Sequence, residues 1–322
     1  KMARYVKKET GKKNLCLAGG VALNCVSNGN LLRSGLFDDI WIQPAAGDAG
    51  GALGCAFLTW YQFLGNHRIA DINDSMKGSF LGPEYSNEII ESFLEKNNYP
   101  YQILSNENIA EKIADLISEQ KVIGWFQGRM EFGPRALGSR SIIGDARSPE
   151  MQKTMNLKIK YRESFRPFAP SVRAENISEY FEIDRQSPYM LLVAQVQKNK
   201  QLKMTKEQNS YFGLDKLNVA RSGLPAITHV DYSARVQSVN SKTNNRYHLM
   251  LTKLYEKYGC PVVVNTSFNV RGEPIVCTPN DAYLCFMRTE MDFLVMNNYL
   301  LDKTKQNPLI EDSDWRSRFE LD

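Results

Sequence analysis

"LCLAGGVALN", residues 15–24, joins a short apolar run to a pair of glycines and then to a helix-like segment. Strand-like and helix-like segments alternate along the chain around this stretch. This pattern predicts strands over 14–18 and 40–43 and helices over 22–33 and 49–64. A βαβα order with short glycine-marked joints favours a parallel sheet. A sheet of only two strands would be marginal by itself.

The remainder of the chain predicts a second, mixed α/β unit. Residues 65–88 are polar and rich in turn-forming residues, so we divide the chain into domains 1–70 and 71–322. A capping box of Thr278 and Asp281, with Pro279 between them, should begin the last helix. The other expected helices are 86–97, 107–120 and 244–258, and the expected strands are 101–104, 122–126, 168–172, 190–197, 234–239, 262–264 and 293–296.

Composition is that of an ordinary globular protein, with 43% hydrophobic residues in a chain of 322. No apolar run approaches the roughly 20 residues that cross a membrane, and no signal-peptide pattern follows the N-terminus. We therefore expect a cytoplasmic protein with no membrane partner. The six cysteines lack any Cys-x-x-Cys spacing and are expected to be buried thiols.

Positive charge is concentrated in one region, although the net charge is only +4. Residues 129–173 hold ten Lys/Arg against four Asp/Glu, which leaves 30 basic and 32 acidic residues elsewhere. A compact basic region of this kind suits a small polyanion better than a long nucleic-acid track.

Two basic stretches follow one another. "GRMEFGPRALGSRSIIGDAR", 128–147, is expected to be largely irregular backbone whose arginines bind phosphate, or else a solvated surface loop. Ser148 and Pro149 predict the start of a helix that places Lys158 and Arg162 on one face and turns Lys160 away. Arg166 follows before a stiff apolar strand, and a solvent-facing helix is the alternative for this stretch.

Two polar stretches could complete a site. "VVVNTSFNVRGEPIV", 262–276, brings amide, hydroxyl and guanidinium groups to the end of a buried strand, as an oxyanion or carbonyl requires; a ligand-free turn is the alternative. In "THVDYSARV" we expect His229 and Asp231 to share one strand face, binding one ligand or each other. A structural histidine is the alternative there. The histidines together show no metal-ligand spacing.

Taken together, these stretches resemble the NodU/CmcH-type O-carbamoyltransferases over nearly the whole chain. The resemblance rests on "LCLAGGVALN", "WIQPAAGDAGGALG", "GRMEFGPRALGSRSI", "NLKIKYRESFRPFAPSV", "THVDYSARVQ" and "VNTSFNVRGEPIV". It implies two modules: an actin-like (ASKHA) domain, of which 1–70 would be a truncated βαβα remnant, and a mixed-sheet YrdC-like domain. "TSFNVRG", 266–272, matches a loop of YrdC proteins.

The resemblance also implies the chemistry. Carbamoyl phosphate is hydrolysed, carbamate condenses with ATP to carbamoyl-adenylate and pyrophosphate, and the carbamoyl group passes to an acceptor hydroxyl near an iron ion. Asp48 matches an iron ligand and could equally cap a helix. We expect the histidine pair of that iron site, and with it half of the acceptor domain, to lie in a portion preceding this chain. The iron site would then be incomplete, and transfer to the acceptor alcohol would fail.

On this basis we expect the phosphates of ATP and carbamoyl phosphate, with Mg²⁺ brought by the nucleotide, to meet a single set of side chains. The catalytic candidates are Lys158, Arg162, Arg166, Ser267, Asn269 and Arg271. The candidates for binding the nucleotide and phosphates are Gly19, Gly20, Asn24, Arg129, Arg135, Asn265, Thr266 and His229. The alternatives are a non-catalytic nucleotide- or RNA-binding module and a threonylcarbamoyl-adenylate synthase; we expect no nucleic-acid partner.

Overall fold

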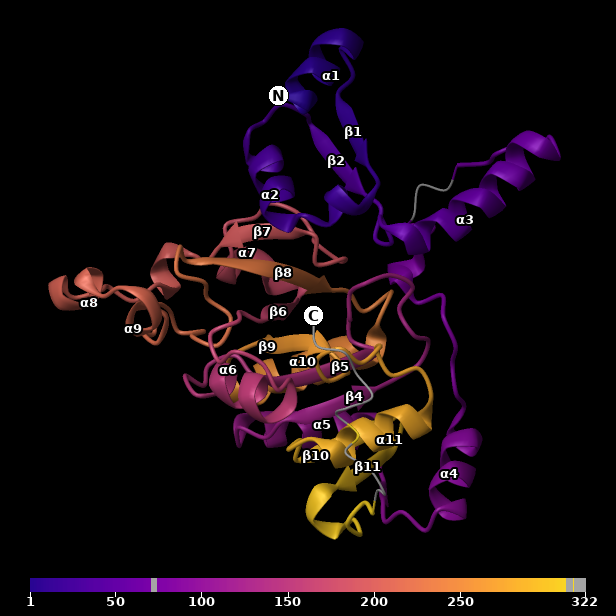
Figure 1. Ribbon diagram of the computed structural model, residues 1–322, viewed down its shortest axis with the longest axis vertical. Helices are drawn as coiled ribbons and strands as arrows, with labels where there is room; N and C mark the ends of the chain where they lie inside the picture. Colours follow the sequence, from indigo (N-terminus) through magenta and orange to yellow (C-terminus); the bar gives the residue numbers. More distant parts are fainter. Residues whose placement is uncertain (71–73, 311–314, 316–322) are drawn as a thin grey trace.

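The computed structural model describes residues 1–70, 74–310 and Trp315, and it contains a small and a large β-sheet. Figure 1 shows the N-terminal unit seated at one end of the body that the large sheet forms. An α/β architecture with a large mixed sheet, as the sequence predicts, is therefore confirmed. The predicted boundary between 70 and 71 stays a prediction, and residues 71–73 lie outside the described residues.

The N-terminal unit has the predicted parallel pair of strands, β1 and β2. A helix not predicted from the sequence, α1, precedes them, and the expected helix over 22–33 begins as a 3₁₀ turn, η1. Helix α3 and its π-helical continuation η2 project from the body and bury none of their own residues (Figure 1). The bounds are α1 Met2–Thr10, β1 Asn14–Leu17, η1 Gly20–Leu23, α2 Cys25–Arg33, β2 Asp39–Ile42, α3 Asp48–Leu58 and η2 Thr59–Phe63.

The large sheet has nine strands in the order β3-β11-β10-β4-β5-β9-β6-β8-β7. Only the pairs β10–β4 and β6–β8 are parallel. The strands are β3 Gln102–Ile103, β4 Ile123–Phe126, β5 Arg140–Asp145, β6 Ala169–Arg173, β7 Leu192–Gln195, β8 Ser233–Val239, β9 Val262–Ser267, β10 Phe293–Met296 and β11 Tyr299–Asp302.

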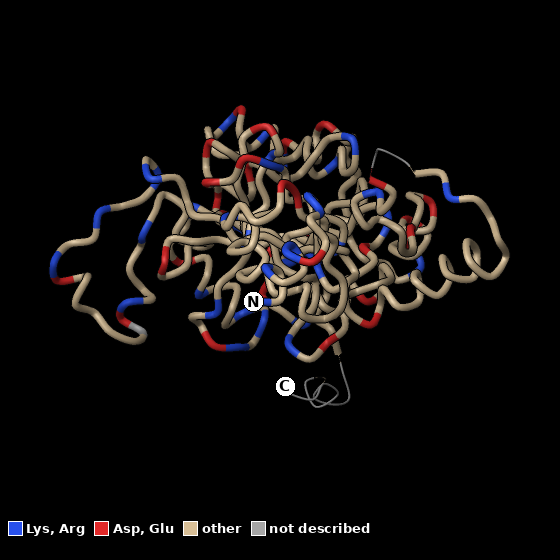
Figure 2. Tube along the Cα trace, turned by 90° about the horizontal axis from the view of Figure 1, so that it is seen from above, with Lys and Arg blue, Asp and Glu red and all other residues tan. Residues whose placement is uncertain are grey.

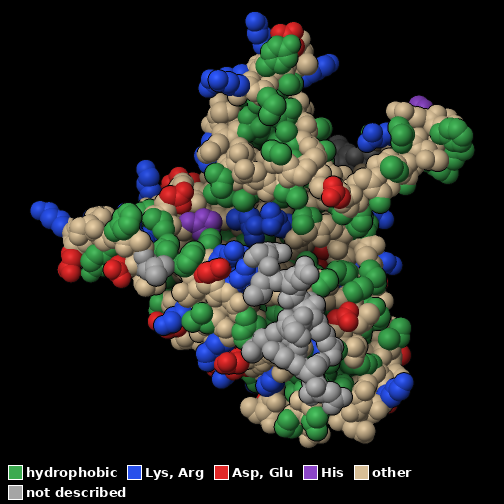
Figure 3. All heavy atoms as spheres, viewed as in Figure 1, with side chains coloured by type: hydrophobic (Ala, Val, Ile, Leu, Met, Phe, Trp, Pro, Cys, Tyr) green, Lys and Arg blue, Asp and Glu red, His purple; other side chains and the backbone are tan. Residues whose placement is uncertain are grey.

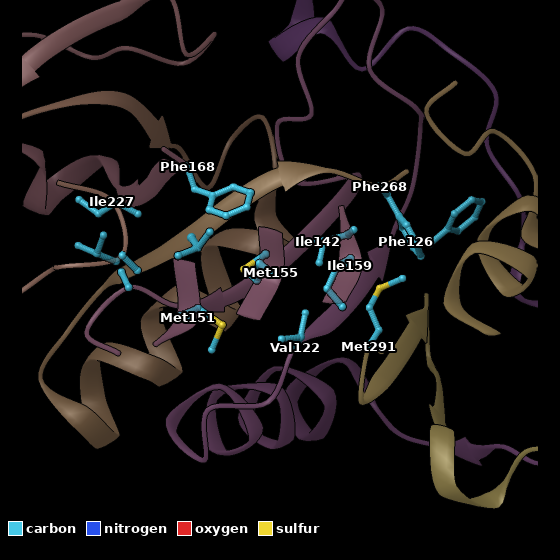
Figure 4. Close-up of a cluster of buried hydrophobic side chains, with 14 of the residues drawn as sticks. Val122, Phe126, Ile142, Met151, Met155, Ile159, Phe168, Ile227, Phe268 and Met291 are labelled. Atoms are coloured by element: carbon cyan, nitrogen blue, oxygen red, sulfur yellow. The ribbon is translucent and has the colours of Figure 1, made fainter. Parts of the chain in front are cut away.

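Alternating side chains of the central strands supply two cores, one on each face of the large sheet. Ile142 and Val264 belong to the larger core, drawn in part in Figure 4, whereas their neighbours Ile143 and Val263 belong to the other. Helices α5 Asn106–Ser118 and α10 Asn245–Tyr258 cover the second core, and α4 Asn87–Lys96 and α11 Pro279–Arg288 contribute to the first. The predicted capping box of Thr278 and Asp281 begins α11.

Short helices occupy the connections. They are η3 Lys77–Ser79, α6 Met151–Thr154, η4 Met155–Ile159, η5 Ala174–Asn176, α7 Ile177–Tyr180, η6 Lys198–Lys200, α8 Lys206–Ser210, α9 Gly213–Leu217 and η7 Lys303–Lys305.

The stretch 128–147 is largely irregular, as expected, except that residues 140–145 form the buried strand β5 in the middle of the sheet. Two other expectations are wrong. The helix expected from Ser148 begins only at Met151 and passes into the π-helix η4. His229 and Asp231 do not lie on a strand, because β8 begins at Ser233.

The N-terminal unit packs on strand β7 through α2. The amide of Asn28 donates to the carbonyl of Leu191 at 3.1 Å, and the guanidinium of Arg33 donates to the carbonyl of Val193 at 2.6 Å. Trp41 meets Tyr189 edge to face at 6.0 Å between ring centroids. These contacts hold the N-terminal unit against β7, so that the unit forms one wall of the space beside β7 and β8.

Basic and acidic residues are interspersed along the trace of the chain (Figure 2). Within the described ranges, no helix combines the length and apolarity needed to span a bilayer. The expectation that all cysteines are buried is wrong, since Cys16 and Cys55 are exposed.

Candidate functional site

A cavity of about 420 Å³ lies where the N-terminal unit meets the large sheet. Figure 3 shows Lys and Arg side chains gathered on this face, below the N-terminal unit. Segments far apart in sequence line it: Cys25 and Val26 from α2, 134–136 between β4 and β5, 162 and 166–169 before and into β6, His229 and Arg235 around the start of β8, and 265–267 from β9. The sequence stretches singled out above therefore converge here.

Four arginines face this one cavity: Arg135, Arg162, Arg166 and Arg235. Burial first, and neighbouring guanidinium groups after it, lower the pKa of both Arg162 and Arg235 to about 10. Both still carry their charge at neutral pH. Because like charges are held together in a partly dehydrated space, an anion with several oxygens would relieve their mutual repulsion.

Asn156 in η4 fixes the position of two of these arginines. Its Oδ1 accepts from Arg162 Nε at 2.6 Å, and its Nδ2 donates to the carbonyl of Arg166 at 2.8 Å. The guanidinium of Arg162 also lies 5.0 Å from the ring centroid of Phe168. Since Asn156 is fully buried, this arrangement is held before any ligand arrives.

Asn265 anchors the end of β9 against the other walls. Its Nδ2 donates to the carbonyl of Ala136 at 3.2 Å and to Ser171 Oγ and Gln237 Oε1, both at 2.9 Å. Thr266 and Ser267, which follow, line the cavity. The predicted polar turn therefore faces the arginines. The side-chain N–H groups of Asn265, however, already donate hydrogen bonds within the protein and are not available to a ligand.

Helical periodicity predicted that Lys160 points away from the site. In the structure its side chain instead supports the polar turn from the side opposite the cavity. Its ammonium donates to Ser267 Oγ at 3.2 Å, to Asn269 Oδ1 at 2.7 Å and to the carbonyl of Asn269 at 2.8 Å, and it also contacts the Ser267 carbonyl. Ser267 Oγ in turn donates to Asn269 Oδ1 at 2.6 Å. Asn269 is therefore a support for Ser267 and not one of the cavity-lining residues.

The segment that carries Arg135 is folded around the buried carboxylate of Glu131. Its Oε1 accepts from the backbone N–H of Leu137 at 2.6 Å and of Ser139 at 2.8 Å, and both carboxylate oxygens lie within 3.3 Å of the Arg140 N–H. Burial raises the pKa of Glu131, opposed by these hydrogen bonds. Arg140 is fully buried and donates to the carbonyl of Gln127 at 3.0 Å, so it supports the loop and does not face a ligand.

Three predicted phosphate-binding residues lie outside the cavity. Lys158 is more than half exposed and pairs with Glu290 at 2.9 Å. Arg129 is also more than half exposed, pairs with Glu84 at 3.4 Å, and lines a separate pocket of about 340 Å³. Arg271 does not line the cavity, but it lies 3.8 Å from Glu163, which also pairs with Arg166 at 3.8 Å. Lys158 and Arg129 therefore do not join Arg162 and Arg166 at this cavity, and the roles expected of all three side chains stay predictions.

No residue of the "GGVALN" stretch lines the cavity, whose lining begins at the next residue, Cys25. Asn24 caps α2 by accepting from the Ser27 N–H at 3.0 Å, and the carbonyl of Leu23 accepts from Arg135 Nη2 at 3.4 Å. Gly19 has φ +90°, a conformation that favours glycine, while neither Gly19 nor Gly20 lines the cavity. Asn24 thus contributes by capping α2, whose first turn, with Cys25 and Val26 on the cavity wall, can meet an anion.

Asp48 does not belong to a metal centre built from the residues described. It is exposed, it lies in the first turn of α3, and the helix cap is Gly47 and not Asp48. Over 1–70, 74–310 and Trp315, no group of three or more His, Cys, Asp or Glu could hold a metal ion. The described residues alone therefore do not complete an iron site, the role of Asp48 as one ligand stays a prediction, and we assign no chemical step to the ion.

Arg235 and Lys160 are the site residues that sequence reasoning missed. Arg235 was visible in "THVDYSARV" but carried no assigned role. Lys160 could not be placed by helical periodicity, because the π-turn of η4 shifts the direction of the residues after it.

Comparison with known proteins identifies the family of this chain. Residues 1–57 match the family Carbamoyltransferase N-terminus, and residues 114–303 match Carbamoyltransferase C-terminus. The chain belongs to the NodU/CmcH-type carbamoyltransferase family. The cavity draws lining residues from both matched regions.

Relatives of this carbamoyltransferase chain include nodulation proteins. Nodulation protein NolO of Bradyrhizobium diazoefficiens is 43% identical over 93% of this chain and 51% of its own length. The 3'-hydroxymethylcephem-O-carbamoyltransferase of Streptomyces clavuligerus is 29% identical over 87% of this chain and 47% of its own. An uncharacterized protein of Synechocystis sp. is 58% identical over 100% of this chain and 53% of its own. The chain thus spans about half the length of the curated relatives it matches.

Proposed function

We propose that this chain carries the donor-activating site of an O-carbamoyltransferase, which binds carbamoyl phosphate and ATP and forms carbamoyl-adenylate. The observation that supports it is the convergence of Arg135, Arg162, Arg166 and Arg235 with residues 265–267 on one cavity of about 420 Å³. That volume is within the roughly 300–1,000 Å³ usual for small-molecule sites.

In the proposed reaction, water cleaves carbamoyl phosphate to carbamate and phosphate. A carbamate oxygen then attacks the α-phosphorus of ATP, the bond to the bridging oxygen breaks, and pyrophosphate leaves with its electron pair. Two anions must be brought together, so the arginines lower the barrier by neutralising phosphate charge that is already in place. Mg²⁺ would enter with the nucleotide and neutralise further phosphate charge.

The turn at the end of β9 would orient the carbamoyl group of carbamoyl phosphate. Ser267 and Thr266 face the cavity, and Lys160 and Asn269 hold Ser267 from behind. The N-terminus of α2, with Cys25 and Val26 on the wall, adds the positive end of a helix dipole. We further propose that the body from residue 71 onward is YrdC-like and the N-terminal unit part of an actin-like domain.

The whole protein would then pass the carbamoyl group to the hydroxyl of a sugar, an antibiotic or a nodulation factor. Relatives named for nodulation and for a cephem support that range of acceptors. The N-terminal unit, which forms one wall of the cavity, is where such an acceptor domain would receive the activated group.

The test is pyrophosphate release from ATP plus carbamoyl phosphate. Arg166→Ala should lower the rate at least about 100-fold, as removal of a fixed positive group from a charged transition state does. The matched control is Lys121→Ala, which removes a surface cation paired with Asp292 at 3.5 Å, outside the cavity. Unchanged release in Arg166→Ala would remove this arginine from the site.

A further inference from the structure

His229 lies on the wall of the cavity and is held by two side chains of its own loop. Ser233 Oγ donates to Asp231 Oδ1 at 2.6 Å, and the same oxygen lies 3.2 Å from His229 Nδ1. The backbone closes the loop as well, since the His229 N–H donates to the carbonyl of Ser233 at 2.8 Å. Asp231 Oδ1 also accepts from the Ser233 N–H at 3.1 Å.

This arrangement fixes the tautomer of the imidazole. A serine hydroxyl has one hydrogen, and Ser233 gives it to the carboxylate of Asp231, which can only accept. Only lone pairs of Ser233 Oγ remain for the ring, so His229 Nδ1 must carry a proton and donate it. In the neutral ring, Nε2 then presents a lone pair, and no described residue hydrogen-bonds to it.

Burial is the main reason why the imidazole of His229 stays neutral near pH 7. Burial is the first cause that lowers the pKa of His229, Arg235 lowers it further, and Asp231 opposes them. Arg162 and Arg166 face the same cavity, and Arg221 lines the neighbouring pocket that shares His229. Cations thus outnumber the single carboxylate beside the ring.

A hydrogen-bond acceptor is unusual among the groups of this wall. The four arginines can only donate, and the hydroxyl of Ser267 already donates to Asn269 and accepts from Lys160. Asn265 Oδ1 is an acceptor without a partner but is closed off from solvent. The hydroxyl of Thr266 also lines the cavity and can either donate or accept, whereas His229 Nε2, in the tautomer that Ser233 fixes, can only accept a hydrogen bond from a ligand.

We propose that Asp231, acting through Ser233, positions His229 so that Nε2 accepts a hydrogen bond from the –NH₂ group of the carbamoyl donor. Asp231 and Ser233 are positioning residues, and His229 determines specificity for a carbamoyl over an acyl phosphate. This inference rests on the proposed function, because it assigns the end of the cavity that takes the amide.

The first measurement tests the tautomer without any ligand. The chain has three histidines, so His67→Gln and His248→Gln together leave His229 as the single source of imidazole ¹⁵N signals. We expect the ¹⁵N shifts of a ring protonated at Nδ1, and a shift toward the Nε2-protonated form in Asp231→Ala, where Ser233 is free to donate. An Nε2-protonated ring in the otherwise wild-type chain would overturn the proposal.

The second measurement compares carbamoyl phosphate with acetyl phosphate, in which a methyl group replaces –NH₂. By calorimetry the wild type should bind carbamoyl phosphate roughly five- to tenfold more tightly, the value of one net hydrogen bond. His229→Phe should abolish this preference, while His229→Gln, whose Oε1 can accept, should retain part of it.

The outcomes separate the two proposals. Equal affinity of the wild type for both phosphates, or an undiminished preference in His229→Phe, would overturn the amide contact while leaving the donor site in place. Binding of neither compound would overturn the proposed function and the amide contact with it. The tautomer measurement decides the roles of Asp231 and Ser233 in either case.

Discussion

Lys160 shows how one local irregularity redirects a site. In a regular helix from Ser148 onward, Lys158 and Arg162 share a face and Lys160 points elsewhere, which is what periodicity predicts. The π-turn of η4 instead buries Lys160, at 3% exposure, beneath the turn at the end of β9. Lys158 is left at the surface beside Glu290.

Substitution of Lys158 and of Lys160 distinguishes a regular helix, with Lys158 at the site, from the π-turn, with Lys160 beneath the turn at the end of β9. Lys160→Met removes the donor that holds Ser267 and Asn269, so affinity for carbamoyl phosphate should fall about tenfold or more, as when buried acceptors lose a charged partner. Lys158→Met breaks only an exposed ion pair. Titration calorimetry of both variants measures the difference, and a larger loss in Lys158→Met would contradict the placement.

Burial of Lys160 also predicts a pH dependence of stability. Burial lowers its pKa to about 7, well below the value of a free lysine, so the unfolded chain binds this proton more tightly than the folded one. The contribution of Lys160 to the free energy of unfolding should therefore rise between about pH 7 and 10. It should disappear as the pH falls through the pKa that Lys160 has in the folded protein.

Urea unfolding of the wild type and of Lys160→Met at several pH values in that window measures this contribution. The wild type should gain stability relative to the variant as pH increases. A difference between the two proteins that does not change with pH would contradict it.

At the scale of elements, the parts predicted well from the sequence are those with strong local signals. The strand at 293–296 has the expected bounds and the helix capped by Thr278 begins where expected, because an apolar run and a capping box act locally. Strand β5 was missed because glycines and arginines dominate its neighbourhood. Its position depends on Glu131, six residues from Leu137, a contact that no periodicity reveals.

Glu131→Ala tests how this element is held. Removing the carboxylate leaves three buried backbone N–H groups without their acceptor, so the free energy of unfolding should fall by about 3 kcal/mol. Because the same loop carries Arg135, carbamoyl phosphate binding should weaken as well.

The control is Glu111→Ala, which changes an exposed residue paired with Lys257. Chemical denaturation of both proteins provides the comparison. Equal stability of the two variants would contradict this role of Glu131.

At the scale of the whole molecule, the cavity depends on how α2 meets β7. The sequence predicted each polar stretch as a candidate but could not predict this contact, since residues about 160 positions apart form it. Gly29 is the point of closest approach, because a Cβ atom there would lie 2.5 Å from the carbonyl oxygen of Val193.

Gly29→Val should therefore loosen the N-terminal unit, at a cost of about 1–3 kcal/mol for the forced separation. Hydrogen exchange at the amides of α2 and β7 should become faster. Gly51→Val in α3 is the matched control, because a Cβ atom there meets nothing within 4 Å. Equal protection of these amides in the two variants would show that the contact does not hold the unit.

The central claim is that one cavity, walled by both units, receives the phosphate of the carbamoyl donor. A crystal structure of the chain with carbamoyl phosphate tests it most directly. We expect the phosphate oxygens to lie within hydrogen-bonding distance of Arg162, Arg166 or Arg235, with the carbamoyl end toward Ser267 and His229. Phosphate bound instead in the separate pocket of Arg129, with the arginine cavity holding only solvent, would contradict the account.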